Sequence, residues 1–303
     1  MNALNKLIVA TLPAVPRPIV RHFANQYIAG EEIPDAVTTV KKLNSEGCMA
    51  TLDVLGEDIT ERAEAVSSRD MIIEVLNTIQ KENLDSNVSI KPTQLGLKLD
   101  RNFCLENTKT IAQKAKEIGS FVRLDMEDSS TTDDIIWLYR EVRREYPDVG
   151  IVLQAYLRRT ANDARQLMAE GLGNFRFCKG IYREPEAIAY KQYNEINNNF
   201  IEILKMMWDK KAYIGVATHD DPLIEAAERM INIRKLKKEE YEFQMLLGVK
   251  PELRRRLIRN GHRVRIYVPF GKHWYRYSIR RFKENPQIAG YVFKALFKSS
   301  NSN

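Results

Sequence analysis

The sequence has little of the composition that marks several broad classes of protein. Its three cysteines (Cys48, Cys104 and Cys178) lack a C-x-x-C spacing, which argues against a disulfide framework or a cysteine-rich zinc site and indicates a reducing cytoplasm. With four widely separated histidines, a metal site built on them is not expected. Glycine (14) and proline (11) are too few for a collagen-like or disordered chain. The longest apolar runs, about ten residues, are too short to cross a bilayer, which takes roughly 20 and so excludes an integral membrane protein.

Positive charge is concentrated at one end of the chain. The net charge is +7, but residues 250–303 hold 14 Lys and Arg against 2 Asp and Glu, whereas the rest hold 33 against 38. Such a segment is typical of a solvated basic helical face, or of a surface for nucleic acid, an anionic bilayer or an anionic small ligand. Because the stretch KHWYRYSIRRFKEN interleaves basic and aromatic residues, composition by itself leaves nucleic acid open.

Eight short, β-branched apolar runs alternate with stretches of helical period. In one such stretch, Ile72, Ile73, Leu76 and Ile79 fall on the same helical face. Strand followed by helix, repeated eight times in about 260 residues, predicts an α/β fold of the (βα)₈ TIM-barrel type. No G-x-G-x-x-G follows the first run, which weighs against a dinucleotide-binding open sheet. The predicted strands are Cys48–Val54, Val88–Pro92, Phe121–Met126, Gly150–Ala155, Phe175–Gly180, Ala212–Ala217, Tyr241–Leu247 and Val264–Val268.

No low-complexity linker divides the chain, so residues 1–303 are predicted to form a single domain. Residues 1–46 are interpreted as extra N-terminal helices, 47–284 as the barrel and 285–303 as a C-terminal helix or tail. The run after Lys6 faintly resembles a signal sequence, but it is short and Pro13 follows, so a packing helix is preferred. The tail after Pro286 has one apolar face, which fits a helix packed on the barrel or a contact surface for a membrane or a partner.

Polar residues at the ends of the predicted strands are the candidates for chemistry, because that is where active sites lie in such barrels. Lys91 and Asp125 lie near the ends of adjacent predicted strands, where an ion pair would keep both groups charged. His219 beside Asp220 suggests a catalytic dyad, but no nucleophile motif such as G-x-S-x-G accompanies it. A structural or ligand-contacting histidine is therefore favoured.

Two further pairs suit an anionic ligand. Gly180 lets a ligand approach the backbone, and Lys179 beside it can donate to a carbonyl, a phosphate or a ring nitrogen. Arg280 and Arg281 diverge by roughly 100° on a helix, so they meet only on a group above its axis. A carboxylate fits their rigid forks, although two ordinary surface arginines explain the same spacing. A Schiff-base lyase using Lys91 or Lys179 and a basic nucleic-acid-binding protein remain alternatives.

Together the strand-end motifs resemble the proline dehydrogenases, FAD-dependent (βα)₈-barrel enzymes, in their single-function bacterial form. The likeness runs from Asp53 to Glu284 and is weaker in the N-terminal helices. Ile181, where alanine is commoner, is a departure that removes no catalytic group. The motifs are Arg-Leu-Asp125-Met-Glu, Leu-Gln154-Ala-Tyr-Leu, Arg176-x-x-Lys179-Gly180-x-Tyr182, Ala-Thr218-His219-Asp, Glu242-Phe-Gln244-Met-Leu, Tyr267-x-Pro-x-Gly271 and Tyr277-x-x-Arg280-Arg281-x-x-Glu284.

The resemblance implies roles for individual residues, and no metal among their ligands. Arg280 and Arg281, helped by Lys91, would clamp the carboxylate of proline, and Asp125 would pair with that lysine. Tyrosines would wall the apolar five-membered ring; they are Tyr182, Tyr267 and Tyr277. Arg176 resembles the arginine near the flavin N5, and it forms with Asp125 the catalytic set. The implied FAD contacts are Met126 and Gln154 with the isoalloxazine, Cys178, Lys179 and Gly180 around it, and Thr218 and His219 with the ribityl-pyrophosphate and adenosine part.

The implied reaction is the oxidation of L-proline to Δ¹-pyrroline-5-carboxylate, the first step of proline catabolism. A hydride passes from proline C5 to flavin N5 while the nitrogen loses a proton, and the carboxylate clamp aims C5 at the flavin. A quinone-type acceptor would take the electrons, and the basic C-terminal segment offers a surface for docking on a membrane. The expected location is the cytoplasm, or the periphery of the membrane's inner face. A separate pyrroline-5-carboxylate dehydrogenase is the expected functional partner, and nucleic acid is not. Hydroxyproline or another cyclic imino acid is the alternative substrate.

Overall fold

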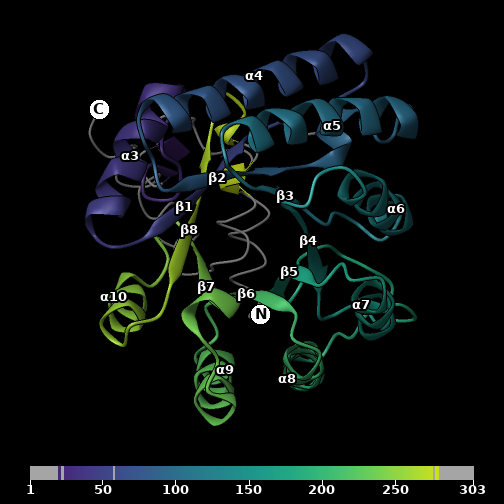
Figure 1. Ribbon diagram of the computed structural model, residues 1–303, viewed down its shortest axis with the longest axis vertical. Helices are drawn as coiled ribbons and strands as arrows, with labels where there is room; N and C mark the ends of the chain where they lie inside the picture. Colours follow the sequence, from purple (N-terminus) through teal and green to yellow (C-terminus); the bar gives the residue numbers. More distant parts are fainter. Residues whose placement is uncertain (1–19, 22–23, 57–58, 276, 280–303) are drawn as a thin grey trace, which may run out of the picture.

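Eight parallel strands close into a barrel in the computed structural model, which describes residues 20–21, 24–56, 59–275 and 277–279 (Figure 1). Each strand pairs with the next along the chain, and β8 pairs with β1 to complete the ring. The predicted (βα)₈ barrel is therefore confirmed. The strands are β1 (Met49–Val54), β2 (Ser86–Ile90), β3 (Val122–Leu124), β4 (Val149–Gln154), β5 (Asn174–Cys178), β6 (Tyr213–Ala217), β7 (Tyr241–Leu246) and β8 (Val264–Phe270).

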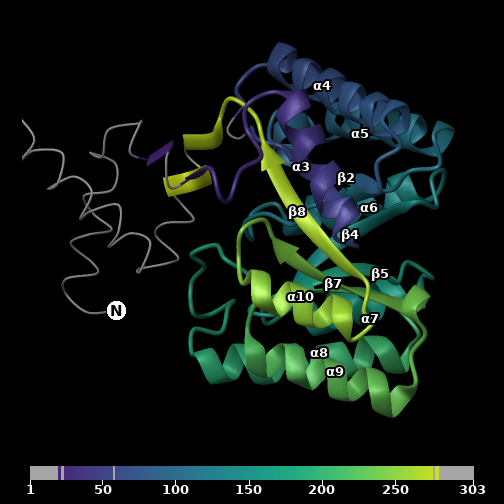
Figure 2. The ribbon, with the colours of Figure 1, turned by 90° about the vertical axis from the view of Figure 1, so that its left-hand side faces the viewer.

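Helices connect successive strands and form the outer layer around the barrel (Figures 1 and 2). A further helix, α3, lies before the first strand and has Pro34 in its first turn. The Asp35 carboxylate accepts hydrogen bonds there from the backbone N–H groups of Glu31 and Glu32. Among the described residues, every helix is too short or too polar to cross a membrane. The helices are α3 (Ile33–Ser45), α4 (Arg62–Lys81), η2 (Pro92–Leu95), α5 (Arg101–Glu117), α6 (Thr132–Arg143), α7 (Thr160–Ala169), α8 (Tyr193–Asp209), α9 (Asp221–Arg234), η3 (Lys238–Glu240) and α10 (Pro251–Arg259).

The predicted strands agree with the structure to within a few residues at each end. The prediction for β2, Val88–Pro92, is displaced by two residues from the observed Ser86–Ile90, and β3, expected over Phe121–Met126, is shortened to Val122–Leu124. Beyond Leu124, the Asp125 backbone N–H still donates to the Ile90 carbonyl at 2.9 Å, and the Glu127 carboxylate accepts hydrogen bonds from both the backbone N–H and the hydroxyl of Thr93. Part of the predicted N-terminal helical region is α3. The helix expected after Lys6 and the C-terminal helix expected over 285–303 lie outside the described residues.

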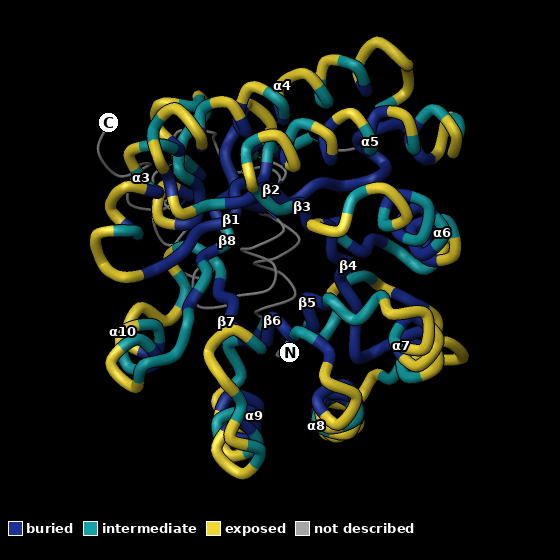
Figure 3. Tube along the Cα trace, viewed as in Figure 1, coloured by how far each residue is buried: buried dark blue, intermediate teal, exposed yellow. Residues whose placement is uncertain are grey.

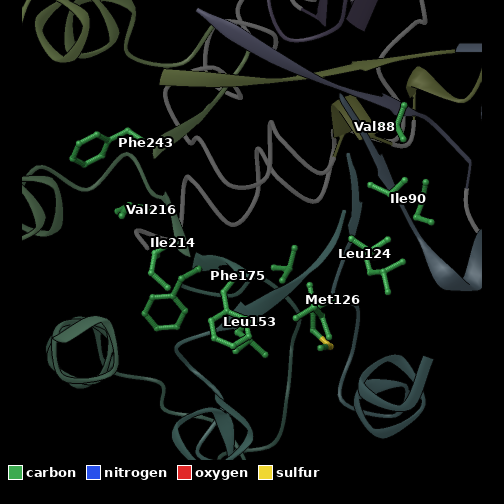
Figure 4. Packing of buried hydrophobic residues seen from close by; sticks show 14 of the residues in the cluster. Val88, Ile90, Leu124, Met126, Leu153, Phe175, Ile214, Val216 and Phe243 are labelled. Carbon is green, nitrogen blue, oxygen red and sulfur yellow. The ribbon is translucent and has the colours of Figure 1, made fainter. Parts of the chain in front are cut away.

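Apolar side chains of the strands pack outward beneath the helices. Alternate residues such as Leu124, Leu153 and Ile214 are at most 2% exposed, and Figure 4 shows such residues around the outside of the ring of strands. Phe177 on β5 stacks on Phe200 of α8 with ring centroids 4.4 Å apart. Figure 3 shows the strands buried and the outer faces of the helices exposed. The apolar core is therefore a cylinder between strands and helices, which leaves the interior of the barrel for other side chains.

Charged residues occupy part of that interior, where bulky apolar layers are usual. Arg265 on β8 donates from Nε to Glu242 Oε1 on β7 (2.8 Å) and from Nη1 to the Ala50 carbonyl on β1 (2.7 Å). Gln244 Nε2 donates to the same Glu242 oxygen at 2.6 Å. Burial alone would raise the pKa of Glu242, but the charge of Arg265 and these hydrogen bonds lower it to about 2. The carboxylate therefore stays charged inside the barrel.

Arg123 on β3 is a second buried cation, and it binds uncharged oxygens. Its guanidinium donates to the Ile151 and Asn174 carbonyls (3.2 and 3.0 Å) and to the Asn174 side-chain oxygen (2.9 Å). Burial and the nearby charge of Arg176 lower the pKa of Arg123 to about 10, so it remains charged at neutral pH. Gly150 makes room for it, because a Cβ there would lie 2.2 Å from Nη1.

Truncating the aromatic contact between β5 and α8 should destabilise the fold. Phe177→Ala removes a fully buried ring and leaves a cavity against Phe200, so we expect unfolding free energy to fall by about 3–5 kcal/mol in urea denaturation. Ile233→Ala on α9 is the matched control, because that side chain is 77% exposed and its loss should change stability by less than about 0.5 kcal/mol. Equal effects of the two substitutions would contradict this packing.

Replacing Glu242 should alter the acid dependence of stability. The pKa of Glu242 in the folded state, about 2, lies below the ordinary value of 4.5, so its charge stabilises the protein above pH 4.5 and this contribution is lost as the pH falls toward 2. We expect the unfolding free energy of the wild type to fall more steeply over that interval than that of Glu242→Gln. At neutral pH the variant should be less stable by about 3 kcal/mol or more, because Arg265 stays buried without its partner. Glu202→Gln, an exposed control on α8, should follow the wild-type profile. Parallel slopes for all three proteins would refute the prediction.

Candidate active site

A cavity of about 650 Å³ opens at the carboxyl ends of β2 to β8. Its volume lies in the range of small-molecule and cofactor sites. The predicted site residues Arg280 and Arg281 lie outside the described residues. All the other predicted site residues line the cavity, namely Lys91, Asp125, Met126, Gln154, Arg176, Cys178, Lys179, Gly180, Tyr182, Thr218, His219, Tyr267 and Tyr277.

An ion pair between Arg176 on β5 and Asp125 after β3 crosses the mouth of the barrel. Arg176 Nη1 lies 2.7 Å from Asp125 Oδ1, and the side chains are 8% and 13% exposed. The Ser89 hydroxyl on β2 donates to the same carboxylate oxygen at 2.6 Å. On its other side, Arg176 donates from Nε to the Gln244 amide oxygen on β7. Asp125, Ser89 on β2 and Gln244 on β7 therefore fix the guanidinium in one orientation at the cavity wall.

Lys91 pairs with Asp53 on β1, so the predicted ion pair with Asp125 is wrong. Lys91 Nζ lies 2.6 Å from Asp53 Oδ1, and the two side chains are 9% and 1% exposed. The adjacency argument was insufficient because β2 has two neighbours, β1 as well as β3. Asp125 on the β3 side is engaged by Arg176 and Ser89 instead. Sequence reasoning gave Asp53 no role, although an acidic residue within the apolar run Met49–Val54 was the available signal.

Tyr267 on β8 lies between the two ion pairs. Its hydroxyl donates to Asp125 Oδ2 at 3.0 Å and lies 3.5 Å from Lys91 Nζ. The Arg176 guanidinium carbon is 5.2 Å from the centre of its ring, a cation–π contact. Burial, followed by the charge of Asp125, raises the pKa of Tyr267 well above 10, so the hydroxyl keeps its proton and remains a donor. The tyrosine thus links the lysine side of the cavity to the arginine side.

A second cluster lies at the ends of β5 and β6. Lys179 Nζ lies 2.9 Å from Asp220 Oδ2, and the Tyr193 hydroxyl donates to Asp220 Oδ1 at 2.9 Å. Burial opposes ionisation of Asp220, but the bonds from Lys179 and Tyr193 outweigh it and the pKa is lowered. His219 Nε2 instead accepts from the backbone N–H of Leu246 at 2.9 Å. The two neighbours therefore bind different partners, as expected of a structural or ligand-contacting histidine rather than of a catalytic dyad.

Gln154 supplies an acceptor at the cavity that its surroundings do not satisfy. Among the described residues its buried Oε1 has no hydrogen-bond partner, while Nε2 is 3.5 Å from the Met126 carbonyl. A buried amide oxygen without a donor is costly, so this atom suits a ligand N–H. Apolar lining from Met126 and Val152 and donors from Arg176 and Lys179 complete the wall. This set fits the mixed apolar and polar edges of an isoalloxazine ring.

The remaining reactive groups at the site do not act as nucleophiles in this setting. Burial raises the pKa of Cys178 to about 11, so its thiol keeps its proton at neutral pH. Lys91 and Lys179 are ion-paired ammonium groups, whereas a Schiff-base lysine needs a neutral amine. Among the described residues, no three His, Cys, Asp or Glu side chains gather where they would hold a metal ion.

Comparison with known proteins gives the same family that the strand-end motifs resemble. The family model described as proline dehydrogenase matches residues 36–293. Proline dehydrogenase 1 of Bacillus subtilis (strain 168) is 35% identical over 275 residues, covering 91% of each chain. A proline dehydrogenase of Deinococcus radiodurans is 34% identical over 302 residues, covering 95% of this chain and 97% of the relative.

Solved structures extend the likeness to the fold. Proline utilization A from Bdellovibrio bacteriovorus, in a crystal structure inactivated by N-propargylglycine, has a TM-score of 0.81 and 25% identity over 88% of this chain. The match covers 33% of that longer protein. The corresponding protein of Bradyrhizobium japonicum, at 18% identity and a TM-score of 0.73, shares the fold. With the family model covering most of its length, this chain belongs to the proline dehydrogenase family, whose members oxidise proline to Δ¹-pyrroline-5-carboxylate.

Proposed function

We propose that the cavity at the strand ends binds FAD and L-proline side by side, and that the chain oxidises L-proline there. The observation that carries the proposal is that all thirteen predicted site residues within the described part of the chain line this one cavity. Its volume of about 650 Å³ and its mixed lining suit a cofactor and a small polar substrate. Arg280 and Arg281 are proposed as carboxylate ligands from the family resemblance.

The chain's own groups would bind and orient both molecules. The unsatisfied Gln154 oxygen offers an acceptor to a flavin N–H, and Arg176 offers a fixed positive charge to the electron-accepting part of the ring. Lys91, at the opposite side of Tyr267, offers an ammonium group to the substrate carboxylate. Because the carboxylate end is held, the C5 end of the substrate is aimed at the cofactor. FAD, when bound, supplies the acceptor for the hydride that leaves C5.

We assign the docking of the basic segment, residues 250–303, on a membrane to the residues after α10. Acidic side chains pair with several of the cations in and next to α10. Lys250 pairs with Asp221 (2.7 Å), Arg256 with Glu228 (2.9 Å), and Arg254 with Glu46. We propose a quinone-type acceptor and a location in the cytoplasm or at the periphery of the membrane's inner face. A separate dehydrogenase would consume the pyrroline-5-carboxylate product.

An absorbance spectrum tests the cofactor and the substrate together. We expect the purified protein to show a flavin band in the visible region, and that band to bleach on anaerobic addition of L-proline. Release of the cofactor by denaturation, followed by mass measurement, distinguishes FAD from other flavins. A colourless protein that does not regain a flavin spectrum when FAD is added would contradict the proposal.

The identity of the ring substrate is tested at Tyr267. By the family resemblance its side chain lies where a 4-hydroxyl would project, so the enzyme should prefer L-proline to trans-4-hydroxy-L-proline. Tyr267→Ser should narrow the ratio of the two kcat/KM values, mainly by lowering activity with proline. Discrimination by one misfitting group is worth about 1–3 kcal/mol, or roughly 10- to 200-fold.

Tyr267→Phe is the matched control for this test, because it keeps the ring and removes only the hydroxyl that donates to Asp125. Its preference for proline should stay near that of the wild type, even if its rate falls. Equal turnover of both substrates by the wild-type enzyme would favour the hydroxyproline alternative.

A further inference from the structure

We propose that Asp53 is a positioning residue that holds the Lys91 ammonium group at the cavity wall and keeps it off Asp125. The inference rests on the proposed function, in which Lys91 binds the carboxylate of proline. Asp53 itself is not among the residues that line the cavity, whereas Lys91 is. The contact through which Asp53 reaches the cavity is therefore its ion pair with the lysine.

The burial of Asp53 shows why the pairing is strong. The residue is 1% exposed, near the carboxyl end of β1, with Ser89 of β2 and Pro269 of β8 as its register partners. A carboxylate so placed is tolerated only with a counter-charge, and Lys91 Nζ lies 2.6 Å from Oδ1. The second oxygen, Oδ2, is buried and has no hydrogen-bond partner among the described residues. The lysine is therefore the contact on which the buried carboxylate depends.

The alternative partner of Lys91 lies a short distance away. The Tyr267 hydroxyl is 3.5 Å from Lys91 Nζ and donates to Asp125 Oδ2 at 3.0 Å. This hydroxyl therefore lies between the ammonium group and the Asp125 carboxylate. Arg176 holds Asp125 from the other side. Without the charge of Asp53, we expect Lys91 to move toward Asp125, which would withdraw it from the substrate and disturb the Arg176 ion pair.

Among the described residues, Asp53 is the acid that contacts this lysine directly. On β1 the group is Asp53, on β8 it is Tyr267, and after β3 it is Asp125. Glu127 also senses the charge of Lys91, but its carboxylate is held by two hydrogen bonds from Thr93. Three carboxylates thus compete for one ammonium group, and the 2.6 Å contact decides where it stands.

The test compares proline kinetics of holoenzyme variants. Asp53→Asn keeps the size of the side chain and removes its charge, so we expect KM for proline to rise about 10-fold or more, the size of one charge-assisted contact, with kcat changed less. Lys91→Met should raise KM at least as much. Adding Asp53→Asn to Lys91→Met should leave KM at the value of Lys91→Met alone, because Asp53 acts through the lysine. Asp163→Asn on α7 is the matched control: its carboxylate is 7% exposed and pairs with Arg159 at 2.7 Å, so it should lose stability without a change in KM.

The outcomes separate this inference from the proposed function. A wild-type KM in Lys91→Met would remove Lys91 from the substrate and overturn the proposed role of that residue. A raised KM in Lys91→Met with an unchanged or lowered KM in Asp53→Asn would overturn the positioning role alone, as would additive effects in the double variant. If Asp53→Asn yields no folded holoenzyme, Asp53→Glu serves instead. It keeps the charge but displaces the carboxylate by one methylene, so the same rise in KM is expected and a wild-type KM would contradict the proposal.

Discussion

Pairing of opposite charges inside the barrel is the constraint on which the rest of the site depends. A lone charged side chain taken out of water costs several kcal/mol, so each one needs a counter-charge or, like Arg123, several hydrogen-bond acceptors at contact distance. The interior meets this requirement by alternating acids and bases around the ring of strands, with Tyr267 and Gln244 bridging neighbouring pairs. Three ion pairs among the described residues show this arrangement: Asp53–Lys91, Asp125–Arg176 and Glu242–Arg265.

This arrangement divides the barrel into two parts with different tasks. Outward side chains such as Phe177 pack beneath the helices and supply the apolar burial that stabilises the fold. That packing frees the interior to hold fixed charges, which serve catalysis because they need no reorganisation when a ligand arrives. Arg176 shows the result: its two sides are held by Asp125 and Gln244, so it presents one orientation to the cavity.

Ion pairing also changes the interpretation of the basic segment at residues 250–303. Residues 250–303 carry 14 cationic side chains against 2 acidic ones, which suggests an exposed basic surface. In the structure, acids from distant parts of the chain meet several of these cations, as Glu46 meets Arg254 and Glu228 meets Arg256. The excess of positive charge in this segment is thus partly balanced by acids from elsewhere in the fold. Composition alone therefore overstates the positive potential around α10.

The sequence by itself determined the fold, because the fold depends on local periodicity, and the list of candidate residues, because the motifs at the strand ends resemble those of the proline dehydrogenases. Alternation of β-branched runs with helical periods marked eight strands, and polar residues such as Lys91 and Asp125 stood out at their ends. Which charges pair with which was decided only by the tertiary structure. Each strand in a closed barrel has two neighbours, and side chains such as Arg176 also reach strands across the interior. Sequence separation carries no information about that choice, so Lys91 was assigned to Asp125 although burial and distance give it to Asp53.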